Sequence, residues 1–223
     1  MRISVVVPAL NEASAIVDTL SRLQTLRDRG HEIIVVDGGS DDETSVLAQP
    51  LADRVITSAR GRARQMNEGA AAAEGDVLWF LHADTHAPLG AERALVSAVQ
   101  TGAQWGRFDV RLSGHHPLLP VIAGMMNLRS RLTGIATGDQ GMFVTRAAFD
   151  AAGGFPDIPL MEDIALSRAL RRVAWPACLR MQLLTSGRRW ETHGVWRTVL
   201  LMWRLRAAYW LGADPAELAR RYR

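Results

Sequence analysis

Short apolar runs separated by stretches of helical periodicity dominate the first hundred residues of the chain. Three β-branched runs, at residues 3–7, 32–36 and 54–57, predict strands. A fourth run, at residues 76–85, is rich in Val, Leu, Trp and Phe and predicts a buried central strand. Between the runs, apolar residues recur at intervals of three and four, as in amphipathic helices. This alternation predicts a parallel α/β sheet with right-handed crossovers.

Strands and helices alternate less regularly in the second half. Residues 88–100 and 164–172 predict amphipathic helices, and residues 105–112 and 173–185 predict strands. Residues 115–132 form an apolar, Met-rich segment that is too short to span a bilayer. We favour a core-packing helix for this segment, and the alternative is a helix that covers the site or touches lipid.

Polar residues mark the expected helix starts and loops. Asn11 is the candidate N-cap of the first helix, and Ser40 or Asp41 is the candidate for the second. Residues 186–194 hold two arginines and a histidine and predict a polar loop.

Three tryptophans recur every seven residues in the C-terminal segment 195–211, at Trp196, Trp203 and Trp210. That spacing places them on one face of a helix. Core packing is the interpretation that we favour for this face. The alternative is attachment to a membrane interface, with Trp and Arg side chains at the depth of the lipid headgroups.

Asp84 follows the fourth apolar run, at the strand end where open α/β sheets bind ligands. A hard divalent cation prefers carboxylate oxygens and keeps bound phosphates among its other ligands. A single carboxylate at this position therefore indicates Mg²⁺ or Mn²⁺ carrying a diphosphate. The alternative is that Asp84 caps the next helix, because Pro88 stands where a first helical turn would begin.

The length of 223 residues fits one sizeable α/β domain or at most two small ones, and the hydrophobic and charged fractions of 48% and 22% are ordinary for a globular protein. All 26 basic residues are arginine, which gives a pI near 9.9 although the net charge is only +3. The arginines are scattered among 23 acidic residues, so the charge pattern does not predict a nucleic-acid partner. The one cysteine, Cys178, excludes an internal disulfide and a cysteine-based zinc cluster.

Targeting signals and common nucleotide-binding motifs are absent from the sequence, which restricts the expected location and the way a nucleotide could bind. The N-terminus has no signal-peptide pattern and no apolar run is long enough to span a membrane, so we expect a cytoplasmic protein. The C-terminal tryptophans leave open a place at the inner face of the membrane. Neither GxGxxG after the first strand nor a GxxxxGK[ST] loop is present, so a nucleotide would be held by carboxylates, arginines and a metal.

Six motifs, taken in chain order, carry a resemblance to a known family. They are SVVVPALNEA, IIVVDGGSDDET, GRARQMNEGA, LHADT, GDQGMFVTRAAFDAAGGFP and MEDIALSRAL. Together they resemble the family-2 glycosyltransferases, and within that family the small bacterial branch associated with radical-SAM and selenium-related genes. The resemblance implies a GT-A fold, in which a Rossmann-like, mostly parallel sheet is flanked by helices. It further implies one domain over residues 1–223, with a nucleotide-binding half (1–103), an acceptor and catalytic half (104–194) and a helical tail (195–223).

The resemblance also implies roles for residues in these motifs. Asp163, preceded by Glu162, matches the catalytic base, and Asp84 matches the last acid of the metal-binding DxD motif. The residues expected at the nucleotide sugar are Pro8, Leu10, Glu12, Asp37, Arg64, Asn67, His82, Ala83 and Asp84. The acceptor-side loop comprises Gly138, Asp139 and Gln140, and the residues expected to close on the diphosphate are Arg188, Arg189 and Trp190.

His82 is a departure from the family pattern, because it stands where the first acid of DxD usually is. It could bind Mn²⁺, form a hydrogen bond with the ribose or the sugar, or only be part of the strand, and we favour the hydrogen bond. His193 is a further candidate metal ligand. For Asp163, the alternative role is that of an acidic residue that stabilises a helix N-terminus.

The predicted function is inverting transfer of a sugar from a UDP- or GDP-linked donor to an unknown acceptor hydroxyl, which could be lipid-linked. In such a reaction a carboxylate deprotonates the acceptor hydroxyl, while a metal and arginines stabilise the departing diphosphate. Two alternatives stay open: a nucleotidyltransferase of similar fold and a non-catalytic nucleotide-binding relative.

Overall fold

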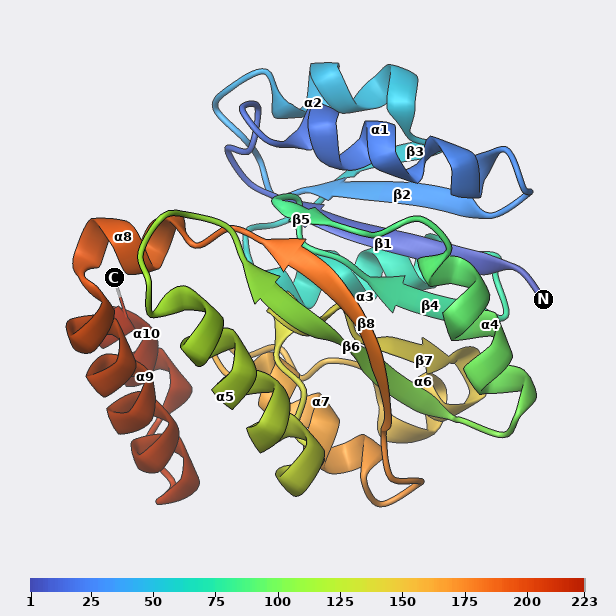
Figure 1. Ribbon diagram of the computed structural model, residues 1–223. Coiled ribbons are helices and arrows are strands. Elements are labelled where there is room, and N and C mark those ends of the chain that lie inside the picture. The colour runs from blue at the N-terminus through green and yellow to red at the C-terminus, as the bar shows by residue number, and fades with distance from the viewer. Residues whose placement is uncertain (223) are drawn as a thin grey trace.

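The computed structural model describes residues 1–222 as one curled, eight-stranded mixed sheet flanked by helices (Figure 1). The strands are β1 (Ile3–Ala9), β2 (Glu32–Asp37), β3 (Arg54–Thr57), β4 (Val77–Phe80), β5 (Thr85–His86), β6 (Trp105–Leu112), β7 (Phe143–Thr145) and β8 (Ala177–Thr185). The helices are α1 (Ile16–Arg27), α2 (Thr44–Ala48), α3 (Arg62–Ala72), α4 (Ala91–Gln100), α5 (Leu119–Thr133), α6 (Arg146–Ala152), α7 (Glu162–Leu170), α8 (Arg188–His193), α9 (Val195–Trp210) and α10 (Pro215–Tyr222). Two 3₁₀ turns, η1 (Gln49–Leu51) and η2 (Gly138–Gln140), complete the elements.

The sheet order is β3-β2-β1-β4-β7-β6-β8-β5. The first four strands are parallel, as the strand and helix alternation predicts. Strand β7 then pairs antiparallel with both β4 and β6, and β6 pairs parallel with β8. The predicted α/β fold is therefore confirmed, and the sheet departs from parallel pairing where β7 is inserted and where β5 pairs with β8 at the edge.

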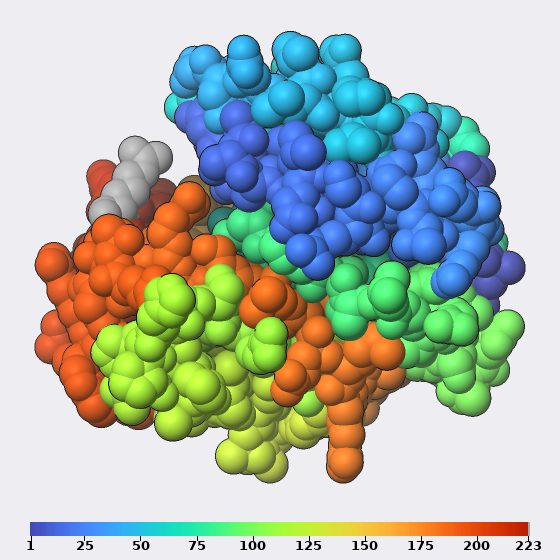
Figure 2. Space-filling view, turned by 45° about the horizontal axis from the view of Figure 1, so that its top comes forward, coloured from blue at the N-terminus to red at the C-terminus, as the bar shows by residue number. Residues whose placement is uncertain are grey.

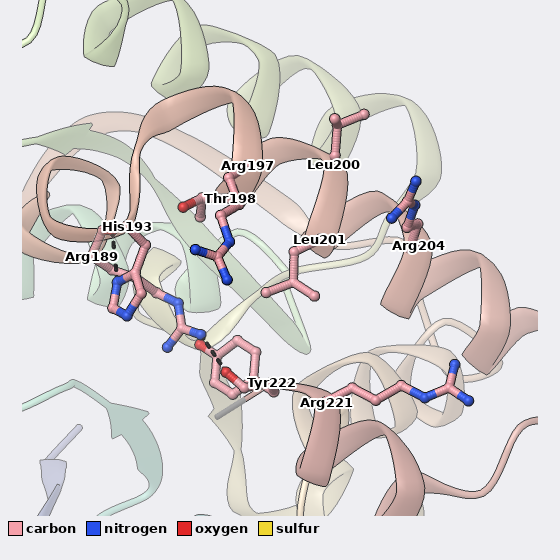
Figure 3. A pocket seen from close by; sticks show the side chains of 9 residues that line it. All are labelled: Arg189, His193, Arg197, Thr198, Leu200, Leu201, Arg204, Arg221 and Tyr222. Carbon is pink, nitrogen blue, oxygen red and sulfur yellow. Dashed lines mark hydrogen bonds between the residues drawn. The ribbon is translucent and has the colours of Figure 1, made fainter.

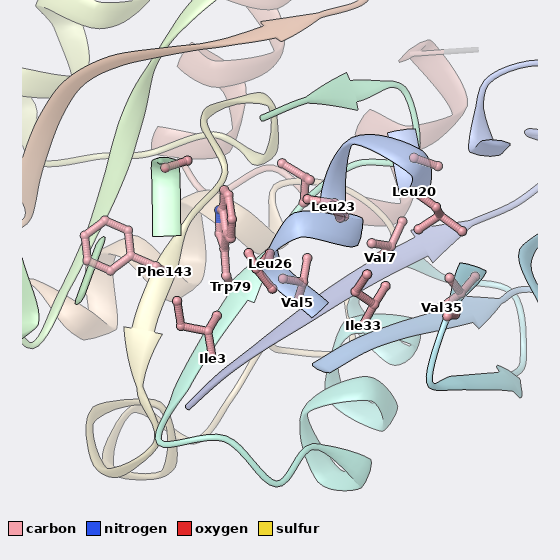
Figure 4. Packing of buried hydrophobic residues seen from close by; sticks show 14 of the residues in the cluster. Ile3, Val5, Val7, Leu20, Leu23, Leu26, Ile33, Val35, Trp79 and Phe143 are labelled. Atoms are coloured by element: carbon pink, nitrogen blue, oxygen red, sulfur yellow. The ribbon is translucent and has the colours of Figure 1, made fainter. Parts of the chain in front are cut away.

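Side chains from alternate positions along the central strands build a core on each face of the sheet. On one face Val5 and Val7 pack with Leu20 and Leu23 of α1 (Figure 4). On the other face Val6 joins residues of α3, α6 and α7. Because both faces are covered, the parallel strands are apolar at nearly every position, which explains why the sequence marks them so clearly.

The C-terminal helices form a separate layer beside α5. α5 packs on α9 through a small cluster that includes Ile122 and Val195, and α10 packs on α9 through Leu205 and Leu218. Residues 188–193 are helical, so the prediction of a loop over residues 186–194 is wrong. The segment was predicted from its polar composition, but a six-residue surface helix needs no apolar stripe.

The favoured interpretation of the C-terminal tryptophans is also wrong. Trp196, Trp203 and Trp210 are 71%, 60% and 75% exposed, so their shared face does not pack into the core. The core contacts of α9 come instead from the face that carries Val195, Thr198 and Leu205. α5 packs into the core through the side that carries Leu119, Ile122 and Ala123, as expected for a core-packing helix. Its remaining face exposes apolar residues.

Three expectations about helix starts are corrected. Asn11 does not cap α1, which begins at Ile16; it adopts φ 55° and its side chain accepts a hydrogen bond from the Asp41 amide at 2.8 Å. Neither Ser40 nor Asp41 caps α2, since the Asp42 carboxylate takes the Thr44 amide at 3.0 Å. Asp84 does not cap a helix either, because β5 follows it and α4 begins only at Ala91.

Within residues 1–222, no helix combines the length and the apolar character that crossing a bilayer requires.

Candidate active site

Three acidic residues lie at the carboxyl ends of neighbouring parallel strands. Glu12 follows β1, Asp37 ends β2 and Asp84 follows β4. Adjacent parallel strands end at the same edge of a sheet, so these side chains share that edge. Burial, and then the nearby Asp84 carboxylate, raise the pKa of Glu12. The surface is recessed where the blue N-terminal segments meet the orange C-terminal ones (Figure 2).

The pair of Glu12 and Asp84 has the character of a cation site. Oε2 of Glu12 is buried and has no hydrogen-bond partner within residues 1–222. A buried, unpaired carboxylate oxygen beside a second carboxylate is unfavourable unless a cation is present. The same part of the chain holds no group of three or more His, Cys, Asp or Glu residues that could bind a metal alone. These residues therefore fit a cation held by one or two carboxylates and completed by a diphosphate, which is how Mg²⁺ is commonly bound.

Asp37 is held in place by the loop that follows β2. Its carboxylate accepts a hydrogen bond from the Ser40 amide at 3.2 Å and a second from the Ser40 hydroxyl at 2.5 Å. Gln65 of α3 ties the same strand ends together, because its Nε2 donates to the carbonyls of Ala9 and Val36 at 2.7 and 2.8 Å. Sequence analysis did not single out Gln65, whose role depends on the docking of α3.

His82 reaches from the end of β4 to the acceptor-side loop. Its Nδ1 lies 3.4 Å from a carboxylate oxygen of Asp139, and its Nε2 is buried without a partner in the described part of the chain. Although burial opposes the effect, this interaction lowers the pKa of Asp139. The ring also packs against Gly138, where an added Cβ would come within 2.4 Å of Nε2. Glycine at position 138 therefore allows His82 to approach the loop.

Asp163 lies in the first turn of α7 and anchors the same loop. One of its carboxylate oxygens accepts from the Gly138 amide at 3.0 Å, and the other accepts from the Ile164 amide at 2.7 Å. Burial, followed by the neighbouring Glu162 carboxylate, raises the pKa of Asp163 to about 6. A carboxyl group with this pKa is suited to take up a proton near neutral pH.

Arg62 of α3 is an arginine of the site that was not predicted from the sequence. Its Nη1 lies 3.4 Å from Oε1 of the buried Glu162, and its charge also acts on Asp163 and Asp139. Arg64, the arginine expected at the nucleotide sugar, instead pairs with Asp157 at 2.9 Å and is half exposed. Both arginines lie in the motif GRARQMN, and only their positions on α3 distinguish them.

The remaining predicted residues divide between the site and its supports. Asn67 bonds to both the amide and the carbonyl of Phe155, at 2.9 and 2.8 Å, and so joins α3 to the loop before α7. Gln140 is fully buried and closes η2 in a capping box with Thr137. Pro8 and Ala83 lie in or beside the strands β1 and β4, and Leu10 is 36% exposed at the end of β1.

Three consecutive residues make contacts in different parts of the molecule: Arg188, Arg189 and Trp190. The positive charge of Arg188 acts on Glu12 and offsets part of the rise in its pKa that burial causes. Arg189 instead stacks on the ring of Tyr222 and, with His193, lines a pocket between α9 and α10 (Figure 3). Trp190 packs against the cluster that joins α5 to α9. The arginines around His193 disfavour a cation at that histidine.

Comparison with known proteins identifies relatives of the chain. The sequence model of glycosyl transferase family 2 matches residues 4–148. The dolichol-phosphate mannosyltransferase of Pyrococcus furiosus is 32% identical over 110 residues, which are 46% of this chain and 31% of that protein. An uncharacterized glycosyltransferase of Mycobacterium tuberculosis is 36% identical over 85 residues, 36% of this chain and 32% of that protein. The matches thus span about a third of the length of these curated relatives.

Solved structures share the fold over most of the chain. Staphylococcus aureus TarS has a TM-score of 0.67 at 17% identity, over 83% of this chain and 60% of the TarS chain. Glucosyl-3-phosphoglycerate synthase from M. tuberculosis, in complex with Mg²⁺ and UDP, has a TM-score of 0.62 at 25% identity, over 82% of this chain and 70% of that chain. Another structure of that synthase holds Mn²⁺, UDP and phosphoglyceric acid. These likenesses confirm the predicted GT-A fold.

Proposed function

The chain belongs to glycosyl transferase family 2, and from this premise we propose that it transfers a sugar from a nucleotide-diphosphate sugar to an acceptor hydroxyl. The observation that carries the proposal is the buried Asp163 carboxyl, whose pKa is raised to about 6 at the ligand-binding edge of the sheet. A helix-opening acid that serves only the helix N-terminus gains by staying ionised. A raised pKa instead favours the role of general base.

The donor side of the proposal rests on Glu12, Asp37 and Asp84. The synthase and TarS relatives have been crystallised with UDP, so we propose a UDP-linked donor, with a GDP-linked donor as the second choice. Asp37 takes the base, and Pro8, Leu10 and Ala83 line its surroundings. Asp84, with Glu12 beside it, would hold Mg²⁺ or Mn²⁺. That cation would neutralise charge on the diphosphate.

Asp163 acts on the acceptor. Its carboxylate removes the proton from the acceptor hydroxyl as that oxygen attacks the anomeric carbon from the face opposite the leaving diphosphate, so the configuration inverts. Glu162 supports this step by raising the pKa of Asp163, and Arg62 holds Glu162. His82 forms a hydrogen bond with a sugar hydroxyl through the Nε2 that lacks a partner within residues 1–222. Gly138, Asp139 and Gln140 shape the acceptor side, and Arg188 approaches the diphosphate.

A membrane-facing surface is a further part of the proposal. α9 exposes Trp196, Leu200, Trp203 and Trp210 along one stripe, and α5 exposes a second apolar stripe. The second stripe comprises Val121, Met125, Leu128 and Leu132. Neither helix carries an acidic residue, and together they carry five arginines. Apolar stripes with only cationic charge are complementary to an anionic lipid surface, and we propose that surface as the occupant.

The packing of α5 against α9 places both stripes on one side of the molecule. The two helices descend together in Figure 1 and meet through Ile122 on α5 and Val195 and Val199 on α9. The contact residue Ile122 follows its stripe residue Val121 by one position, whereas Val195 precedes Trp196. In helices that run in the same direction, these opposite offsets turn both stripes toward the same face.

Single-domain organisation over the halves 1–103 and 104–194 is part of the same proposal, since β4 of the first half pairs with β7 of the second. The bacterial radical-SAM and selenium-associated branch and the cytoplasmic location stay predictions from the sequence.

Ligand-dependent thermal stabilisation tests the proposed function against its alternatives. We expect UDP with Mn²⁺ to raise the melting temperature, because a ligand that binds only the folded state stabilises it. The Asp84→Asn variant should lose the Mn²⁺-dependent part of the shift, and Asp150→Asn, on the exposed face of α6, should retain it. A larger shift with UTP than with UDP would favour a nucleotidyltransferase. The absence of any divalent-dependent nucleotide shift would favour a non-catalytic relative.

A further inference from the structure

A pocket of about 290 Å³ lies between α9 and α10 and is lined by basic side chains (Figure 3). Its basic residues are Arg189, His193, Arg197, Arg204 and Arg221. None of the described lining residues is acidic. Cationic side chains gathered in this way repel one another, so the pocket is electrostatically suited to an anion.

Two of these arginines have no partner in the described part of the chain. Arg221 pairs with Glu217 on its own helix. Arg197 and Arg204 are exposed, and they form no ion pair or side-chain hydrogen bond within residues 1–222. α9 itself contains no acidic residue that could neutralise them. The charge of these two guanidinium groups is therefore available to a ligand.

Two contacts with Tyr222 fix the side chain of Arg189, which lies at the start of α8. Its guanidinium carbon lies 3.7 Å from the centre of the Tyr222 ring, and its Nη2 donates to the Tyr222 carbonyl at 2.6 Å. Stacking fixes the plane of the guanidinium, so little rotational freedom remains to be lost when an anion binds. A planar fork of N–H donors matches the oxygens of a phosphate group.

Tyr222 connects this pocket to the proposed catalytic carboxylates. Burial raises the pKa of Tyr222, and the charges of Arg189, Arg62, Asp139 and Asp163 also act on it. Tyr222 therefore lines the pocket and is also within electrostatic reach of Asp139 and Asp163. A group bound in the pocket would place the rest of its molecule close to the proposed base.

Apolar side chains form the remaining wall. Leu200 and Leu201 line the pocket, and Leu200 also belongs to the exposed stripe of α9. The pocket volume of about 290 Å³ is near the lower end of the range for small-molecule sites, which begins at about 300 Å³. We therefore expect it to hold a small group, such as one charged group with a short carbon segment.

We propose that the pocket binds a phosphate group carried by the acceptor, with Arg189 and Arg197 as its donors and with Arg204, whose guanidinium group lies apart from theirs in Figure 3, adding positive charge. This inference rests on the proposed function for the identity of the acceptor, but the binding of phosphate can be measured without catalysis. The phosphate source is either a soluble phosphomonoester or the headgroup of a lipid, and both present the same oxygens to the arginines.

Calorimetric titration with glycerol 3-phosphate tests the soluble source. Saturating UDP and Mg²⁺ are included, so that the proposed donor site is filled. We expect the native protein to bind, and Arg197→Gln/Arg204→Gln to bind at least about tenfold more weakly. Arg172→Gln/Arg180→Gln removes the same charge from two other exposed arginines and should bind as the native protein does.

Vesicles test the lipid source. Phosphatidylcholine vesicles that contain phosphatidic acid, or phosphatidylglycerol at equal negative charge, are co-sedimented with the same three proteins, so that recognition of the phosphate is separated from attraction to any anionic surface. Arg197- and Arg204-dependent binding of glycerol 3-phosphate supports a soluble acceptor, and the same dependence seen only with phosphatidic acid supports a lipid acceptor. Equal binding by the native protein and the pocket variant, or no binding of either probe, would overturn the proposal.

UDP binding, measured separately, distinguishes this failure from that of the proposed function. UDP binding without phosphate binding would contradict the proposed phosphate pocket and leave the proposed transferase function standing. Phosphate binding without any nucleotide binding would contradict the proposed function and leave the phosphate pocket standing.

Discussion

Asp163 combines the two properties that a general base needs at this edge of the sheet. Its two carboxylate oxygens are oriented by the amides of Gly138 and Ile164. Burial and Glu162 together raise its pKa to about 6, so it is ionised at neutral pH yet basic enough to accept a proton. The orientation and the basicity come from different neighbours, so they can be changed separately.

The pH dependence of donor turnover reports on Asp163. Below pH 6 the carboxyl is protonated and cannot act as a base, so kcat/KM should fall about tenfold for each pH unit. Above pH 6 the profile should reach a plateau. The Asp163→Asn variant should lose about 10²- to 10⁴-fold in kcat and show no such limb. A native profile that stays flat from pH 5 to pH 7 would contradict the assignment.

The pH dependence of stability is an independent check on the raised pKa of Asp163, because stability should fall over the pH range in which activity rises. The unfolded carboxyl titrates near its ordinary pKa of 3.8, and the folded one titrates near 6. Between these values the folded state holds more protons, so the native protein loses stability as the pH rises from 4 to 6. The Asp163→Asn variant lacks this group, so its free energy of unfolding should rise relative to that of the native protein over the same window.

Single residues differ in how far the sequence could identify them. Asp84 stands alone at a strand end, and Asp163 opens a helix in a recognisable motif, so both could be selected. Arg62 and Arg64 share one motif, and the structure pairs the first with Glu162 and the second with Asp157. The partner acids lie about a hundred residues away, and no local pattern indicates which arginine meets which acid.

At the scale of elements, buried strands were the most predictable. The ranges predicted for β1 and β2 begin at the observed first residues and end within two residues of the observed ends, because two-sided burial leaves continuous apolar runs. α8 was missed, since a short surface helix carries no periodic apolar signal. The spacing of the α9 tryptophans correctly predicted one shared face, but periodicity alone does not say whether that face meets the core or the solvent.

The exposed face of α9 gives a prediction at this scale. We expect the native protein to co-sediment with vesicles that contain phosphatidylglycerol, because the apolar stripe enters the interface and the arginines meet the headgroups. Trp203→Gln should reduce the bound fraction several-fold. Trp175→Gln is the matched control, since Trp175 is 55% exposed and lies outside α5 and α9.

Two outcomes would contradict a membrane occupant. One is equal co-sedimentation by native protein and Trp203→Gln. The other is a dimer that forms without lipid and is lost in Trp203→Gln, which would assign the face to a second copy of the chain.

At the scale of the molecule, strand β7 shapes the site. Its insertion between β4 and β6 places the η2 loop, which precedes it, against His82 at the end of β4. α7 then presents Asp163 to that loop. The strand and helix alternation predicted the parallel half, but β7 is three residues long, and its antiparallel pairing across the sheet has no local signal. The site as a whole therefore depends on a pairing that sequence patterns did not predict.

Turnover of nucleotide sugars without an added acceptor tests the central claim most directly, because water can then take the place of the acceptor hydroxyl. A panel of UDP- and GDP-sugars is incubated with Mn²⁺ or Mg²⁺ and with native protein, Asp84→Asn, Asp163→Asn and Asp150→Asn. We predict that the native protein and Asp150→Asn release the nucleoside diphosphate from at least one donor, and that the other two variants lose this activity. Turnover by Asp163→Asn at the native rate, or failure of the native protein to bind any nucleotide sugar, would contradict the account.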